Sequence, residues 1–171
     1  MFNFFFIINC GNIKLGDKMK KIKLGIASDH RGYNLKCELI KHLKQNDYDI
    51  IDCGTMSDDS CDYPDYAYQL GQKILNQEVE FGIGICGSGI GISIALNKIK
   101  GIYCAKVNNS EEAHYTRLDN NTNCVAFSSD IDFKEAIKIV ETFVNTEFSN
   151  LEKHIRRINK VKEIENGVFN G

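Results

Sequence analysis

The sequence of 171 residues contains one proline, no tryptophan and no Cys-x-x-Cys pair, although seven cysteines are present. An odd number of scattered cysteines argues against a disulfide framework and against a zinc site of familiar spacing. Free thiols are typical of a reducing compartment, so a cytoplasmic location is expected. The scarcity of proline and the lack of a linker-like stretch predict a single domain over residues 21–171.

The sequence also lacks an excess of one charge sign and a long apolar run. The net charge is −2, from 21 basic and 23 acidic residues, so no global basic field favours nucleic acid or a membrane surface as a partner. No apolar run approaches the roughly 18 residues of a membrane span. Residues 2–8 (FNFFFII) are apolar, but they lack the basic leader and cleavage site of a secretory signal. Residues 1–20 are predicted to be a disordered N-terminal extension, with a weak targeting segment as the alternative.

What is present is a regular alternation of short apolar runs and longer amphipathic stretches. The alternation predicts an α/β fold, a Rossmann-like doubly wound five-stranded parallel sheet of order 2-1-3-4-5. The expected strands are 22–27, 49–52, 81–86, 102–107 and 124–127, and the expected helices are 33–45, 65–76, 88–98, 110–118 and 133–145. An extra C-terminal helix over 149–165 either folds back on its own sheet or lies across a partner.

Two polar clusters follow the first and third expected strands. In open α/β sheets, ligands bind beyond the carboxyl ends of the strands where the strand order reverses, here between strands one and three. Residues 28–32 read SDHRG and residues 86–91 read CGSGIG. Glycines at this spacing let backbone amides approach an anion, although close packing is an alternative reason for them. The loop matches neither the dinucleotide fingerprint nor a P-loop, so it is interpreted as a cradle for an oxyanion or a small phosphate.

Three further observations point to bound chemistry. Cys86 ends a strand just before a helix N-terminus, a position that favours the thiolate. His30 lies in the predicted crevice, where a ligand contact is favoured. Lys153 and Arg157 are i,i+4 neighbours in the last helix and repel each other unless an anion joins them. A phosphate would remove that repulsion; an ordinary solvated basic face is the alternative.

Together these elements resemble the type B ribose-5-phosphate isomerase family, which also includes allose- and galactose-6-phosphate isomerases. The resemblance spans residues 21–165 and rests on SDHRG at 28–32, DYPDYA at 62–67, ICGSGIGISIA at 85–95 and NNTN at 120–123. It implies interconversion of ribose 5-phosphate and ribulose 5-phosphate through a cis-enediolate, in the pentose phosphate pathway. It also implies no metal or other cofactor, and homodimers or tetramers whose active sites are shared between subunits. An allose- or galactose-6-phosphate isomerase and a non-catalytic sugar-phosphate-binding homologue are the alternatives.

Positions that match the family's motifs carry its roles to this chain by resemblance. Cys86 is implied to be the catalytic base. Ser88 is implied to hold the enediolate oxygen together with the loop formed by Gly87, Gly89, Ile90 and Gly91. The remaining implied substrate contacts are Asp29, His30, Tyr63, Asn120, Lys153 and Arg157.

Two positions depart from the family pattern. The last-helix motif Gly-Arg-His-x-x-Arg reads EKHIRR at residues 152–157, so Lys153 stands where an arginine is common. Asp119 stands where some bacterial members place a ring-opening histidine. Asp119 is therefore expected to be catalytic in ring opening; the alternatives are that His30 opens the ring or that the open-chain sugar is captured.

Overall fold

The structure is a computed structural model that describes residues 21–171. The prediction for residues 1–20 therefore lies outside the described residues. Within the described part, no helix has both the length and the apolar character needed to cross a membrane.

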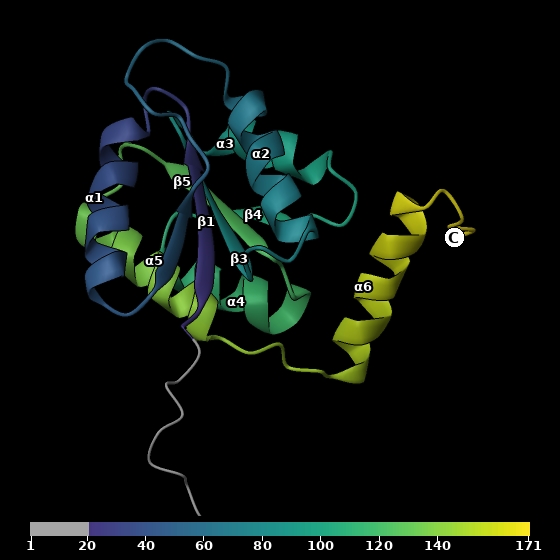
Figure 1. Cartoon of the computed structure of the whole chain (residues 1–171). Helices are drawn as coiled ribbons and strands as arrows, with labels where there is room; N and C mark the ends of the chain where they lie inside the picture. The colour runs from purple at the N-terminus through teal and green to yellow at the C-terminus, as the bar shows by residue number, and fades with distance from the viewer. Residues whose placement is uncertain (1–20) are drawn as a thin grey trace, which may run out of the picture.

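Five strands alternate with helices along the chain, as the sequence predicted (Figure 1). The strands are β1 (Lys23–Ser28), β2 (Asp49–Asp52), β3 (Phe81–Cys86), β4 (Cys104–Lys106) and β5 (Cys124–Ser128). The helices are α1 (Tyr33–Gln45), α2 (Tyr63–Leu75), α3 (Ile90–Asn97), α4 (Ser110–Asn120), α5 (Phe133–Asn145) and α6 (Glu152–Glu165). All strand pairs are parallel, so the Rossmann-like α/β class is confirmed.

The predicted strand order 2-1-3-4-5 is wrong in its second half. The observed order is β2-β1-β3-β5-β4, so β5 and not β4 lies beside β3. In β5, four of five residues are buried, whereas the three residues of β4 are only partly buried. A strand covered on both faces takes the interior place, and the short half-exposed strand takes the edge.

Helices cover both faces of the sheet, and each face has its own apolar core. One core joins the sheet to α1, α4 and α5, through residues such as Leu39, Ala113 and Ile139. The other joins the sheet to α2 and α3, through Leu70 and Leu96 among others. On this second face the strands carry small residues because the helices come close. A Cβ added to Gly25 would lie only 2.6 Å from Cδ1 of Leu70.

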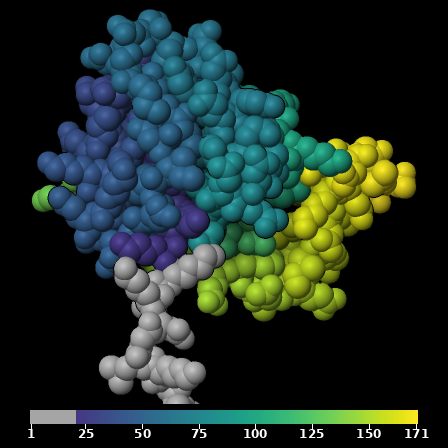
Figure 2. All heavy atoms as spheres, viewed as in Figure 1, coloured from purple at the N-terminus to yellow at the C-terminus, as the bar shows by residue number. Residues whose placement is uncertain are grey.

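Helix α6 does not fold back onto the sheet. It stands to one side of the body in Figure 1 and forms a projecting ridge in Figure 2. Polar contacts hold it near both ends. The imidazole of His154 contacts Asp119 and Ser149, and the carboxylate of Glu165 accepts hydrogen bonds from the Gly101 amide and the Tyr103 hydroxyl. Apolar side chains on α6, including Val161 and Ile164, remain exposed.

Candidate active site

The two predicted polar clusters meet at the carboxyl edge of the sheet. Ser28 at the end of β1 pairs with Ile85 near the end of β3. The next amide, that of Asp29, donates to the carbonyl of Ile85 at 3.1 Å. Because the helical connections leave the sheet in opposite directions on either side of this pair, the crevice between β1 and β3 is the topological switch point. The two predicted clusters therefore lie together at this switch point, although the strand order beyond β3 differs from the prediction.

Cys86 is the last residue of β3 and begins the glycine loop. It is 4% exposed, and its Sγ accepts a hydrogen bond from the Gly89 amide at 3.2 Å. Gly89 has φ +76°, and a Cβ there would lie 2.7 Å from the carbonyl carbon of Phe127. Only glycine fits both the left-handed backbone and this close approach to β5. The tight turn brings an amide donor to the sulfur at the point where β3 leads into the loop.

Ser88 and Tyr63 flank the loop on its open side. The Ser88 Oγ accepts from the Ile90 amide at 3.2 Å. This contact uses the oxygen as an acceptor, so the hydroxyl hydrogen can be donated to a ligand. The ring of Tyr63, from the start of α2, lies over Gly91, where an added Cβ would be 2.8 Å from the tyrosine Cζ. The structure thus places the DYP element beside the glycine loop.

Asp29 and His30 follow β1 directly, and part of their hydrogen-bonding capacity is already used. Asp29 is buried, and its Oδ1 accepts from the Gly32 amide at 3.0 Å, which caps the turn that follows β1. The His30 Nδ1 lies 3.2 Å from the Cys61 amide nitrogen, from which it accepts in one tautomer. This contact leaves Nε2 as the ring nitrogen that can meet a ligand.

Residues at the end of β5 support the loop, and sequence reasoning missed them. The Ser129 amide donates to the carbonyl of Cys86 at 2.9 Å, and the Ser128 hydroxyl donates to the carbonyl of Gly87 at 2.8 Å. The wrong strand order hid these contacts, because it placed β4 where β5 lies. The available signal was the apolar run 124–127 followed by two serines.

Arg31 is a second residue that sequence reasoning did not assign to the site. Its guanidinium lies directly over Gly87, where an added Cβ would be 2.6 Å from Nη1. The side chain is exposed and lies 3.9 Å from a carboxylate oxygen of Asp130. The only sequence signal was its place next to Asp29 and His30.

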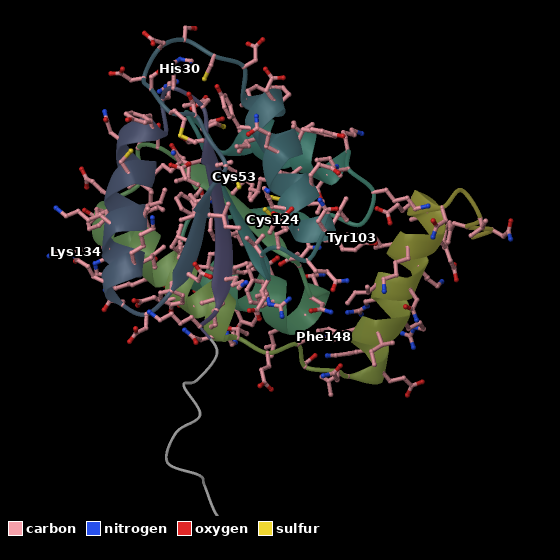
Figure 3. All side chains as sticks on the ribbon, in the orientation of Figure 1. His30, Cys53, Tyr103, Cys124, Lys134 and Phe148 are labelled. Carbon is pink, nitrogen blue, oxygen red and sulfur yellow. The ribbon has the colours of Figure 1, made fainter. Side chains whose placement is uncertain are left out.

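The other predicted contacts lie at the opposite edge of the sheet. Asp119 and Asn120 end α4, just before β5 begins, and the Ser149 amide ties the start of α6 to the same place by donating to Leu118. In Figure 3 the label of His30 lies at one end of the molecule, and that of Phe148, just before α6, lies toward the other. A single chain therefore does not bring Lys153 and Arg157 to the Cys86 loop.

Asp119 is paired with a histidine of α6. Its Oδ1 lies 3.3 Å from Nδ1 of His154, which is buried, and the Ser149 Oγ lies 2.9 Å from the same nitrogen. The Asp119 side chain remains 41% exposed. Lys153 and Arg157, on either side of His154 in the sequence, are exposed.

Two other buried thiols are held in the protonated form. Burial raises the pKa of Cys53 to about 11, with the charge of Asp52 adding to the effect. Burial, followed by a hydrogen bond with Cys104, raises the pKa of Cys124 well above its ordinary value. Neither thiol is an effective nucleophile or base near neutral pH. Over residues 21–171, no group of three or more His, Cys, Asp and Glu side chains is placed to hold a metal ion.

Comparison with known proteins gives consistent matches over most of the chain. Residues 24–161 match the family model described as Ribose/Galactose Isomerase. Ribose-5-phosphate isomerase B of Escherichia coli K12 is 38% identical over 148 residues, which cover 86% of this chain and 97% of the relative.

Solved structures give the same result. Ribose-5-phosphate isomerase B of Clostridium thermocellum superposes with a TM-score of 0.82 at 41% identity, over 85% of this chain and 99% of that one. Ribose-5-phosphate isomerase B of Mycoplasma genitalium, solved with bound ribulose-5-phosphate, has a TM-score of 0.79 at 36% identity, over 85% and 97% of the two chains.

Proposed function

The chain belongs to the ribose/galactose isomerase family, and from this membership we propose that it interconverts ribose 5-phosphate and ribulose 5-phosphate in the cytoplasm. The observation that carries the proposal is the Cys86 thiol at the end of β3, hydrogen-bonded by the Gly89 amide, with β3 paired beside the strand that leads into the Asp29–His30 loop. The Mycoplasma genitalium relative, whose structure contains ribulose-5-phosphate, supports the choice of a pentose phosphate.

Cys86 acts as the base in this mechanism. In the open-chain aldose, its thiolate takes the proton from C2, and the C–H electron pair forms a double bond between C1 and C2. The electrons of the C1 carbonyl move to O1, which gives a cis-enediolate. The thiol then returns the proton to C1, while the O2 proton moves to O1 and a carbonyl forms at C2.

Hydrogen-bond donors of the loop stabilise the developing oxyanion. The Ser88 hydroxyl, held by the Ile90 amide, donates to the enediolate oxygen. The Gly91 amide lies in the first turn of α3, where backbone N–H groups have no partner within the helix. Each such donor is worth about 10²–10³ in turnover, because it is positioned before the charge develops.

The phosphate is held by cations from a second copy of the chain. His30 follows β1 at the carboxyl edge, but Lys153 and Arg157 belong to α6, which stands to one side of the body. A homodimer in which α6 of one copy crosses the other copy's Cys86 loop would complete the site. Exposed apolar side chains favour such docking, namely Ile90 and Ile94 on α3 and Val161 and Ile164 on α6.

Asp119 opens the sugar ring in this proposal. It reaches the substrate from the same second copy, because it lies beside the start of α6. Its partly exposed carboxylate can exchange a proton with the ring oxygen or the anomeric hydroxyl, while His154 fixes its orientation. Asp119→Asn should slow turnover of the cyclic sugar more than turnover of an open-chain substrate; an equal effect on both would refute this role.

Turnover of ribose 5-phosphate by the purified full chain tests the base assignment. Cys86→Ala should abolish activity while leaving phosphate binding intact. Cys37→Ala is the matched control, since Cys37 is an exposed thiol on α1, and it should retain full turnover. Near wild-type turnover by Cys86→Ala would remove Cys86 from the mechanism, and a panel of pentose and hexose phosphates would identify the preferred sugar.

Mixing two impaired variants tests the shared site, with turnover measured at a ribose 5-phosphate concentration far below the KM of Arg157→Ala, so that this variant alone contributes little. Cys86→Ala and Arg157→Ala damage opposite halves, so a hybrid dimer keeps one intact site of its two. Joint refolding of equal amounts should restore about one quarter of wild-type activity, because about half of the dimers are hybrids. Failure to recover activity, with dimers present in the mixture, would show that the site lies within one copy.

A further inference from the structure

The side chain of Arg31 lies over Gly87 in the glycine loop and occupies the space that a side chain at position 87 would need. A Cβ built on Gly87 would meet three atoms of the guanidinium end, namely Nη1 at 2.6 Å, Cζ at 2.7 Å and Cδ at 2.9 Å. The flat guanidinium therefore rests on the backbone of the residue that follows Cys86. Any side chain at position 87 would push Arg31 off the loop.

The charge of Arg31 is only loosely satisfied by the protein. Its Nη2 lies 3.9 Å from Oδ2 of Asp130, and the two side chains are 58% and 75% exposed. An exposed ion pair of this length contributes little to stability, so a stronger anion can replace the carboxylate at small cost. The guanidinium also keeps donors free, because one long contact to Asp130 uses few of its five N–H groups.

We propose that Arg31 is a phosphate-binding residue contributed by the same chain as Cys86, a step that rests on the proposed function. It follows Asp29 and His30 directly, so the guanidinium and the His30 Nε2 belong to one loop at the carboxyl end of β1. Arginine suits phosphate because its planar fork gives two parallel hydrogen bonds. Arg31 then binds the phosphate from one copy while Lys153 and Arg157 bind it from the other.

Asp130 occupies the position of the phosphate beside Arg31 in this arrangement. Its carboxylate partly neutralises Arg31 in the free enzyme and is displaced when the phosphate binds. Two substitutions therefore have opposite expected effects on phosphate affinity: Arg31→Gln weakens it by removing the cation, and Asp130→Asn strengthens it by removing the competing anion.

The test uses the full chain and inorganic phosphate, followed both by calorimetry and as a competitive inhibitor. Arg31→Gln should raise the phosphate Kd and the KM for ribose 5-phosphate by about 10- to 100-fold, the range for one charge-assisted contact. The kcat should stay within about threefold, because the contact exists before and during the reaction. Asp130→Asn should lower the phosphate Kd by about two- to fivefold.

Lys44→Gln is the matched control, since it removes an exposed cation from the far end of α1, and it should leave the phosphate Kd unchanged. An unchanged Kd and KM in Arg31→Gln, or a loss of kcat at constant KM, would overturn the proposal. Calorimetry needs no turnover, so phosphate binding that depends on Arg31 in a chain that fails to isomerise ribose 5-phosphate would contradict the proposed function alone.

Discussion

Replacing Asp52 by alanine would leave the ammonium group of Lys36 buried without its counter-charge. The Lys36 side chain is fully buried, and its Nζ lies 2.5 Å from Oδ1 of Asp52, which is 32% exposed. The same oxygen accepts a hydrogen bond from the Gly54 amide at 3.0 Å. The pair thus joins α1 to the turn after β2, and that turn contacts Ser28 through two backbone hydrogen bonds.

Removing Asp52 and removing Lys36 should lower the stability of the fold by different amounts. Removing one partner of a buried pair typically costs about 3–5 kcal/mol when the other charge stays buried. Asp52→Ala should therefore destabilise the fold by about 3–5 kcal/mol, or lower Tm by about 6–20 °C for a chain of this length. Lys36→Met should lower the stability by only about 1–2 kcal/mol. Water reaches the remaining Asp52 carboxylate, and that carboxylate still accepts the hydrogen bond from the Gly54 amide.

Urea unfolding of the two single variants and the double variant, at one fixed protein concentration, measures these costs. The concentration is fixed because assembly adds stability by mass action. The double variant should be more stable than Asp52→Ala alone, since it no longer buries an unpaired charge. Equal costs for the two single variants, or strictly additive costs in the double variant, would refute the reasoning.

Three further predictions concern the loop, the buried thiol and α6. Gly89→Ala should lower the stability of the fold by about 1–3 kcal/mol because of its positive φ, with a further steric cost, and should remove most of the turnover. Gly167→Ala is the control, because Gly167 has φ +70° but no atom within 4 Å. It should show the backbone cost alone in thermal melts. Because the folded-state pKa of Cys53 is raised from 9.0 to about 11, its contribution to stability is complete below about pH 9 and is lost as pH rises toward 11; Cys53→Ala should flatten that alkaline fall in Tm. Tyr103→Phe removes the hydrogen bond to Glu165 and should speed amide exchange in the last turn of α6 by about fivefold or more, and unchanged exchange would argue against this anchor.

The alternation of strands and helices could be predicted because it follows local burial. Strands such as Phe81–Cys86 read as short apolar runs, and their neighbours carry helical spacing, so element type needed no long-range information. The order of β4 and β5 could not be read in the same way. It depends on which strand packs better between two helical layers. The partial burial of Cys104–Lys106, which fits β4 at the edge, is a property of the folded chain.

The candidate site was predictable where topology fixes it and not where side-chain direction does. The loops after β1 and β3 must meet, because neighbouring parallel strands end at the same edge. The approach of Arg31 to Gly87 depends on a side-chain conformation that spacing does not encode. The separation of Arg157 from Cys86 arises because α6 stands to one side of the body instead of covering the sheet, and spacing along the chain does not encode this.

Isomerisation of ribose 5-phosphate in D₂O, followed by NMR, tests the central role of Cys86 most directly. A thiol that carries the proton from C2 to C1 also exchanges it with solvent, so the wild-type protein should place deuterium at C1 of the ribulose 5-phosphate that it forms. Cys86→Ala should yield neither product nor exchange at C2. Exchange at the wild-type rate in Cys86→Ala would contradict the account, because another group would then be removing the proton.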